Sequence, residues 1–141
     1  MTETKQIKYR KGYKYQLAEW CTIPTNIVWD IKYTIKTEFI HLYGDGDLFI
    51  RGGYSWDGPS GPTIDTKNFM RGSLVHDALY QLMRMGTLDI KWREQADKEL
   101  KRICLEDGMS KIRAWYVYKA VRWGAKRAAL PENKKKILTA P

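Results

Sequence analysis

Apolar and polar residues alternate along much of the first fifty residues, a period typical of β-strands that keep one face in water. Tyrosines alternate with lysines and arginines over residues 6–20, which predicts a strand near Tyr13–Trp20. Pro24 breaks this pattern. Val, Ile, Thr and Tyr resume it over Ile27–Ile40, where we expect two strand segments around Asp30.

A hairpin is predicted next. Gly44, Asp45 and Gly46 form a turn signal, because glycine and aspartate tolerate the positive φ that tight turns require. Leu48–Ile50 is then the returning strand. The first fifty residues therefore predict a small antiparallel sheet.

Helical spacing replaces the alternation after residue 66. A first helix carries His76 near its middle and stops at Gly86, and Asp89 can cap a second helix that Gly108 closes. Ser110 can cap a third helix that runs to about Ala129. The residues expected to face the core from this third helix are Ile112, Tyr116, Val117, Ala120 and Val121.

These elements predict an α+β fold, in which a small N-terminal antiparallel sheet precedes a C-terminal half of three helices. At 141 residues, the length suits one domain, which we place at residues 1–130, with a basic tail at residues 131–141. Cys21 and Cys104 show neither metal-ligand nor disulfide-framework spacing, which fits a reducing compartment. We expect no transmembrane segment and no signal peptide.

Positive charge is concentrated in the second half of the chain. The net charge is +9, yet residues 1–90 hold 11 Lys and Arg against 10 Asp and Glu, whereas residues 91–141 hold 14 against 6. On the third helix, Lys119, Arg122 and Lys126 share a stripe with Trp115. This stripe predicts an anionic partner, either phospholipid, nucleic acid or an acidic host protein, although a merely solvated face would look the same.

The candidate chemistry lies where a Gly/Pro-rich loop meets the first helix. Ser73, His76 and Tyr80 share one helix face, while the apolar residues between them point to the core. Antiparallel packing of the second helix would bring Asp97 to His76, with an ion pair between Asp97 and Arg93 as the alternative. We assign catalytic candidates to His76 as base, Asp97 as the group that fixes its tautomer, and Tyr80.

A hard cation is one consistent use of the remaining oxygen donors. Adjacent helical residues diverge by about 100°, so Asp77 cannot orient the His76 ring and must act separately. Asp77, Asp57, Gly58 and Ser60 are the candidate ligands, and calcium is the natural choice for carboxylate and carbonyl oxygens. Asp57 could equally be a turn residue.

Two resemblances follow from these motifs. The run G-Y-S-W-D-G-P-S-G-P, followed by S-L-V-H-D-A-L-Y-Q-L-M-R and then Asp97, resembles small phage and prophage proteins of the domain of unknown function 1353 family. That resemblance implies a viral context, in the host cytoplasm or the virion, and supplies no activity. It covers roughly Tyr13–Gly124.

The segment H-D-A-L-Y also resembles the H-D-x-C-Y helix of secreted phospholipases A2. In that superfamily a glycine-rich calcium loop precedes the His-Asp helix, and a distant aspartate supports the histidine. Leu79 stands where that motif has a cysteine, and the disulfide framework is missing. The resemblance implies a metal-assisted hydrolase of an ester or phosphoester.

Two non-enzymatic interpretations stay open at this point. The same polar residues could form a buried hydrogen-bond network in a phage accessory or virion protein. The basic third helix could make the chain a module that binds nucleic acid or a host protein.

Overall fold

The computed structural model describes residues 3–11, 14–30, 32–58, 66–124, 129–130 and 138–141. Its strands are β1 (Tyr9–Arg10), β2 (Tyr15–Leu17), β3 (Cys21–Pro24), β4 (Thr34–Lys36), β5 (Ile40–Tyr43), β6 (Asp47–Ile50) and β7 (Ser55–Trp56). Its helices are α1 (Lys67–Arg84), the short 3-10 helix η1 (Ile90–Trp92), α2 (Arg93–Glu106) and α3 (Lys111–Gly124). The predicted α+β fold is confirmed.

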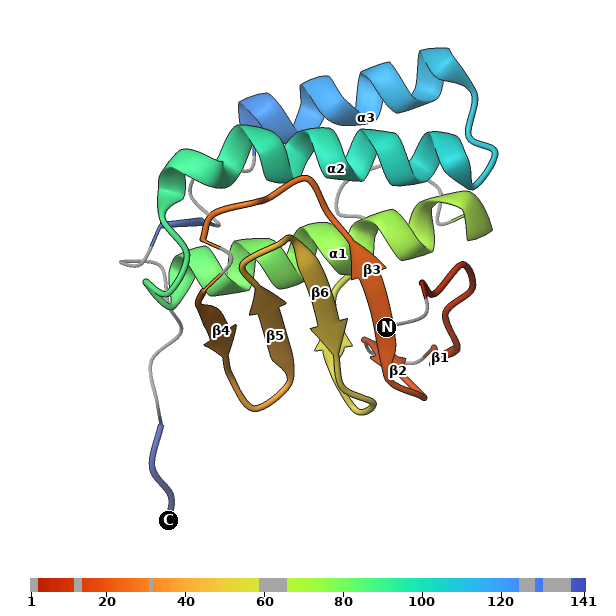
Figure 1. The fold of residues 1–141 in the computed structure, drawn as a ribbon. Helices are drawn as coiled ribbons and strands as arrows, with labels where there is room; N and C mark the ends of the chain where they lie inside the picture. Colours follow the sequence, from red (N-terminus) through yellow and green to blue (C-terminus); the bar gives the residue numbers. More distant parts are fainter. Residues whose placement is uncertain (1–2, 12–13, 31, 59–65, 125–128, 131–137) are drawn as a thin grey trace.

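The strands form two antiparallel sheets instead of one. The first has the order β1-β2-β7 and the second the order β3-β6-β5-β4. In Figure 1 the helices are stacked above the strands, with α1 nearest to them and α3 outermost. Helix α1 therefore has neighbours on two sides.

One row of aliphatic residues shows how the second sheet faces the helices. Ile23 of β3 pairs with Leu48 of β6, which pairs with Leu42 of β5. All three are fully buried, and they share one core with Leu74, Leu79 and other residues of α1. Alternation along the strands thus gives this sheet one apolar face, as the sequence period predicts.

The segment after β3 is a loop and not the strand that was expected from Ile27. Its backbone groups bond elsewhere: the Asn26 N–H donates to the buried Glu99 carboxylate, and the Trp29 N–H donates to the Gly44 carbonyl at 3.1 Å. Ile27 is fully buried although it lies in no strand. Side-chain and turn partners therefore replace strand pairing here. The predicted break at Pro24 is confirmed, since β3 ends on that residue, whereas the strand expected near Tyr13–Trp20 is limited, among the described residues, to β2 at Tyr15–Leu17.

Close contact between α1 and α2 depends on a glycine. A Cβ atom on Gly72 would stand only 2.8 Å from Cys104 Sγ and 3.1 Å from Leu100 Cδ1. The two helices can approach closely because the residue lacks a side chain. Cys104 belongs to a second core cluster between the helices, while Cys21 belongs to the core under the sheets; both thiols are free and buried.

Helix α3 packs through only part of the face that was expected. Ala114 and Val117 are buried and Val121 is half-buried, whereas Ile112, Tyr116 and Ala120 are exposed. The predicted core face was wrong for those three residues, because apolar side chains occupy both sides of this helix. None of the helices in the described ranges is long and apolar enough to cross a membrane.

Candidate functional site

Helix α1 places its polar residues on the side that faces α2. His76 and Tyr80 lie one turn apart, and their ring centroids are 4.1 Å from each other. Val75, Leu79 and Leu82 are fully buried in the main core, as their spacing predicts. The polar side of α1 is buried as well, so each of its hydrogen-bonding groups needs a partner there.

Asp97 of α2 is the common partner. Its Oδ1 atom lies 2.7 Å from His76 Nε2 and accepts a hydrogen bond of 2.6 Å from the Tyr80 hydroxyl. Its Oδ2 atom accepts from Arg122 of α3 at 2.8 Å. The predicted contact between His76 and Asp97 is present, and the carboxylate is completely buried. The alternative ion pair with Arg93 is replaced by the pair with Arg122.

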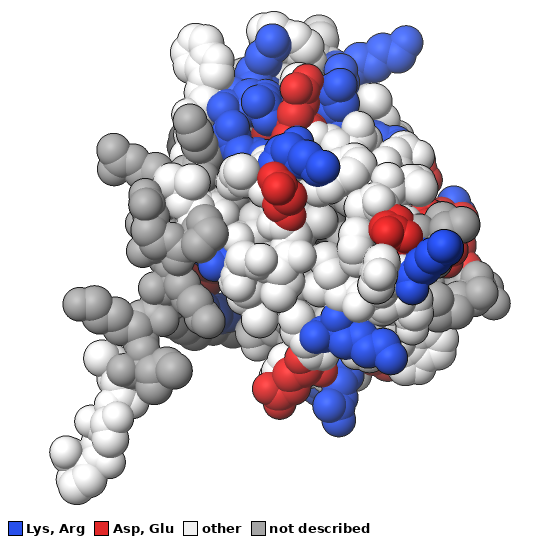
Figure 2. Space-filling model, turned by 60° about the vertical axis from the view of Figure 1, so that its left-hand side comes forward, with Lys and Arg blue, Asp and Glu red and all other residues white. Residues whose placement is uncertain are grey.

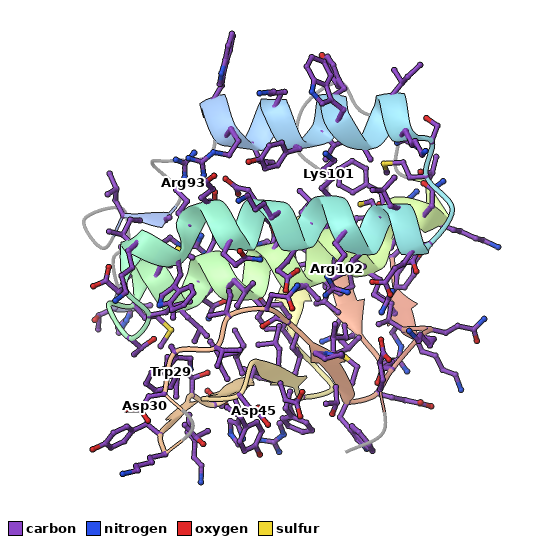
Figure 3. The ribbon with its side chains drawn as sticks, turned by 45° about the horizontal axis from the view of Figure 1, so that its top comes forward. Trp29, Asp30, Asp45, Arg93, Lys101 and Arg102 are labelled. Carbon is purple, nitrogen blue, oxygen red and sulfur yellow. The ribbon has the colours of Figure 1, made fainter. Side chains whose placement is uncertain are left out.

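Arg93 supports the network from a different direction. Its Nε atom donates to the Tyr80 hydroxyl at 3.1 Å, and its Nη2 atom donates to the backbone carbonyls of Val121 and Arg122 at 3.1 and 2.7 Å. Carbonyls in the last turn of α3 are thereby satisfied. Figure 3 shows Arg93 reaching from α2 toward α3. One chain of hydrogen bonds therefore joins all three helices.

The charges of this network explain its pKa shifts. Burial alone would raise the pKa of Asp97, but hydrogen bonds from His76, Tyr80 and Arg122 outweigh it, so the pKa is lowered. Burial alone would lower the pKa of His76, but the carboxylates of Asp77 and Asp97 outweigh it, so that pKa is raised. Burial and Asp97 raise the pKa of the Tyr80 phenol. Asp97 is thus held as a carboxylate.

The second nitrogen of His76 points toward Asp77. His76 Nδ1 lies 3.9 Å from Asp77 Oδ1, beyond direct hydrogen-bonding distance. The Asp77 side chain is 31% exposed, and burial raises its pKa, against the effect of His76. Because Nε2 is engaged by Asp97, Nδ1 is the ring atom left for a further partner.

The loop before α1 reaches the helix through Trp56. The indole Nε1 atom donates to Ser73 Oγ at 3.1 Å, on the same face of α1 as His76. Asp57 turns outward, is 70% exposed and lies 3.3 Å from Lys14 Nζ. Gly58 is buried with φ of +77°, and a Cβ there would stand 2.4 Å from the Tyr15 ring. Ser60 lies outside the described residues.

These positions bear on the predicted calcium ligands. Among the described residues, no group of three or more His, Cys, Asp or Glu side chains could hold a metal ion. Asp77 offers one hard oxygen donor near His76, whereas the Asp57 carboxylate is occupied by Lys14. Asp77 is therefore the predicted acidic ligand that approaches the histidine ring, and the negative charge of Asp57 helps to raise the pKa of Asp77.

The predicted anion-binding residues do not all lie on the surface of α3. Lys119 Nζ lies 5.8 Å from the centroid of the Trp115 ring, and both residues are exposed on α3. Arg122 turns inward to Asp97, and Lys126 lies outside the described residues. Arg122 therefore belongs to the network around Asp97 and His76, although it was predicted to bind an anionic partner. Helical spacing alone groups it with the lysines of α3.

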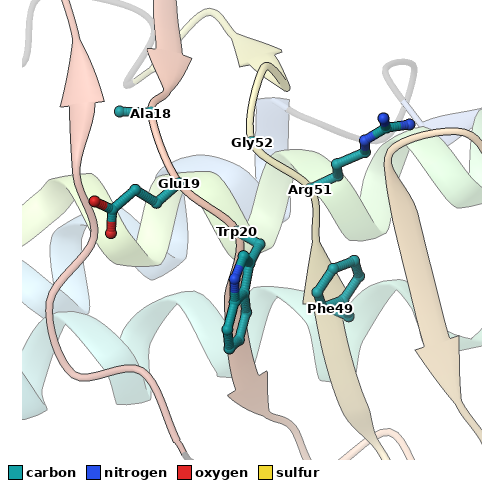
Figure 4. Close-up of a pocket in the computed structure, with 6 residues that line it drawn as sticks. All are labelled: Ala18, Glu19, Trp20, Phe49, Arg51 and Gly52. Atoms are coloured by element: carbon teal, nitrogen blue, oxygen red, sulfur yellow. The ribbon is translucent and has the colours of Figure 1, made fainter.

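A separate aromatic patch lies on the outer side of the second sheet. Trp20 and Phe49 stack with centroids 5.9 Å apart, and His41 lies 5.5 Å from Phe49. Figure 4 shows Trp20 and Phe49 side by side among the residues that line a pocket, with Arg51 extending away from them. His41 thus contributes to the surface of the sheet and not to the network around His76.

Comparison of the chain with protein-family models, with curated proteins and with solved structures found no match.

Proposed function

We propose that the chain hydrolyses an ester or phosphoester with His76 as general base. The observation that carries this proposal is the 2.7 Å contact between His76 Nε2 and the ionised Asp97 carboxylate. A buried carboxylate that fixes one ring nitrogen leaves the other nitrogen as the base. The His-Asp-x-x-Tyr spacing, which resembles that of secreted phospholipases A2, supports the same assignment.

The proton movements follow from this geometry. Because Asp97 accepts a hydrogen bond from Nε2–H, the lone pair of the imidazole is on Nδ1. Nδ1 takes a proton from water as the water oxygen attacks the ester carbon or phosphorus, and the imidazolium returns a proton to the departing alkoxide. Tyr80 and Arg122 keep Asp97 ionised, so the positive charge that forms on His76 is stabilised.

Calcium suits this site in part. Asp77 supplies a carboxylate oxygen with no hydrogen bond from the described side chains, and its position beside Nδ1 would put a bound cation close to the reacting groups. The backbone of the loop around Gly58 and Ser60 would have to supply the remaining oxygen ligands. When bound, calcium would polarise the carbonyl or phosphoryl oxygen of the substrate.

A second candidate function is favoured by the burial of the network. Asp97 is 0% exposed, His76 is 6% exposed, and the carboxylate has three donors. A satisfied polar network of this kind can have a purely structural role, which is to fix the packing of three helices. The chain would then be a non-catalytic phage accessory or virion protein, in the host context that the resemblance to the phage and prophage family implies.

Replacing His76 separates the two candidates. Wild type, His76→Asn and the control His41→Asn are assayed on phospholipid and on simple ester substrates, with calcium and with a chelator, and each is melted. Catalysis predicts that only His76→Asn loses turnover, and that it does so at temperatures where its melting curve shows the variant still folded. If wild type turns over none of the substrates and His76→Asn loses much of its stability, the hydrolase proposal is rejected. The network around Asp97 then has only the structural role of the second candidate.

A further inference from the structure

The outer face of α3 exposes an unusual amount of apolar surface. Four large side chains on this helix are 53–90% exposed: Ile112, Trp115, Tyr116 and Trp123. Their spacing of three, four and seven residues puts them on one side of the helix. We call this set, together with Lys119 in its middle, the α3 outer face. Contiguous exposed apolar side chains of this size mark an interaction site in soluble proteins.

The α3 outer face is not the packing face of the helix. Ala114 and Val117 already bury the opposite side in the core cluster between the helices. Lys101 of α2 reaches the Tyr118 ring, with its Nζ atom 5.6 Å from the ring centroid, and Figure 3 shows Lys101 between the two helices. Among the described residues the helix is therefore anchored on one side and uncovered on the other.

The charge of α3 narrows the choice of partner. The helix contains Lys111, Arg113, Lys119 and Arg122 and no acidic residue. Figure 2 shows Lys and Arg side chains gathered at the top of the molecule, the level at which Figure 1 draws α3. Arg122 is taken up by Asp97, so Lys119 is the cation placed among the exposed aromatic rings. The expected partner is both apolar and anionic.

We infer that the α3 outer face docks on an anionic phospholipid bilayer. Trp and Tyr rings favour the boundary between headgroups and acyl chains, an aliphatic side chain such as Ile112 enters the apolar layer, and a lysine contacts lipid phosphates. Two copies of the face would bring Lys119 and the other cations of α3 against each other. A nucleic acid would use the cations and the rings but would leave Ile112, which is 83% exposed, without an apolar neighbour.

This docking is independent of hydrolysis, because the α3 outer face contains none of the residues that bond to Asp97 in the His76 network. The test measures co-sedimentation with vesicles of phosphatidylcholine, with or without phosphatidylglycerol, in the presence of a chelator. Wild type and His76→Asn should bind the anionic vesicles equally well. Trp115→Ser/Trp123→Ser should bind about tenfold more weakly or worse, and Lys119→Gln should lose most of the preference for phosphatidylglycerol.

The control is Trp20→Ser, which removes a 60% exposed indole from the sheet and should bind like wild type. Melting curves of all variants establish that the replaced surface residues leave the fold intact. The inference is overturned if wild type ignores anionic vesicles, or if Trp20→Ser is weakened as much as the α3 variant. It is also overturned if wild type self-associates, or binds single-stranded DNA, through the same two tryptophans in preference to vesicles.

Discussion

Arg122 of α3 and Asp97 of α2 form an ion pair of 2.8 Å that ends on the carboxylate beside His76. Through Asp97 of α2, a side chain of the outermost helix α3 is therefore linked by charge and hydrogen bonds to His76 of the innermost helix α1. Asp97 is fully buried while Arg122 is 28% exposed, so the pair joins a desolvated anion to a cation that still touches water. The folded state should therefore be more sensitive to the loss of the buried Asp97 carboxylate than to the loss of the partly exposed Arg122.

Asp97→Asn should be among the most damaging single substitutions in the described part of the chain. It removes the charge that accepts hydrogen bonds from His76, Tyr80 and Arg122, and we expect a loss of about 2–4 kcal/mol in unfolding free energy. Urea titration measures this loss. Glu94→Gln is the control on the same helix: its carboxylate is 58% exposed, and its pair with Lys98 should contribute at most about 0.5 kcal/mol. Equal losses in the two variants would contradict the central position of Asp97.

Tyr80→Phe tests the hydroxyl alone, because the ring and its packing are kept. The hydroxyl donates to Asp97 and accepts from Arg93, so its removal should cost about 1–2 kcal/mol in unfolding free energy. Tyr33→Phe, at a ring that is 62% exposed, should change little. If the proposed hydrolysis holds, Tyr80→Phe should also lower kcat more than it raises KM, because Asp97 acts through His76 and not on bound substrate. A variant as stable as wild type would show that this hydroxyl contributes nothing to the network.

Gly72→Ala should destabilise the chain although alanine is the better helix former. The new methyl group would stand 2.8 Å from Cys104 Sγ, and we expect overpacking to cost about 1–3 kcal/mol, more than the roughly 1 kcal/mol gained in helix propensity. Thermal melting checks this. Gly72→Ala/Cys104→Ala should recover part of the loss, because it removes the nearest clashing atom. A single variant that melts above wild type would show that α1 and α2 can separate without penalty.

The pH dependence of stability and that of activity should run in opposite directions. The pKa of His76 is raised in the folded chain, so the stability it contributes is complete below its ordinary value of 6.5 and is lost as the pH rises through the folded value. A general base must be neutral, so turnover should rise across that same interval. Melting temperatures over a pH series, compared between wild type and His76→Gln, measure the first effect. An NMR titration of the His76 ring, assigned with His41→Asn, measures the pKa directly. A His76 pKa below 6.5 would contradict both expectations.

Sequence periodicity located the helices and the contact at the centre of the site. The antiparallel hairpin of α1 and α2 follows from helix stops and caps close in sequence, and such a hairpin brings the middles of its two helices together. His76 and Asp97 were therefore predictable as neighbours. The divergence of successive helical residues predicted that Asp77 stands apart from the contact between His76 and Asp97, and its 3.9 Å separation from His76 Nδ1 agrees with this.

Other features were decided by contacts that no local pattern records. Arg122 belongs to a basic stripe by spacing, and only the position of α3 over α2 turns it toward Asp97. Apolar residues follow helical spacing on two sides of α3, so period alone could not say that small Ala114 packs inward and large Ile112 outward. Ile27 begins a segment of good strand formers, yet it lies in a loop, and the preceding N–H, that of Asn26, donates to Glu99, which is 73 residues away. Tertiary partners overrode the local preference in each case.

The two buried thiols, Cys21 and Cys104, can report on how often different parts of the fold open. Burial raises the pKa of Cys21 and of Cys104 to about 12, so hardly any reactive thiolate exists near neutral pH while the fold is closed. An alkylating reagent can modify either cysteine only while the protein is locally or globally open. The rate of alkylation therefore measures how often that opening occurs. Cys21 reports on the core under the sheets and Cys104 on the contact between α1 and α2. Single-cysteine variants would therefore show whether the helices loosen independently of the strands.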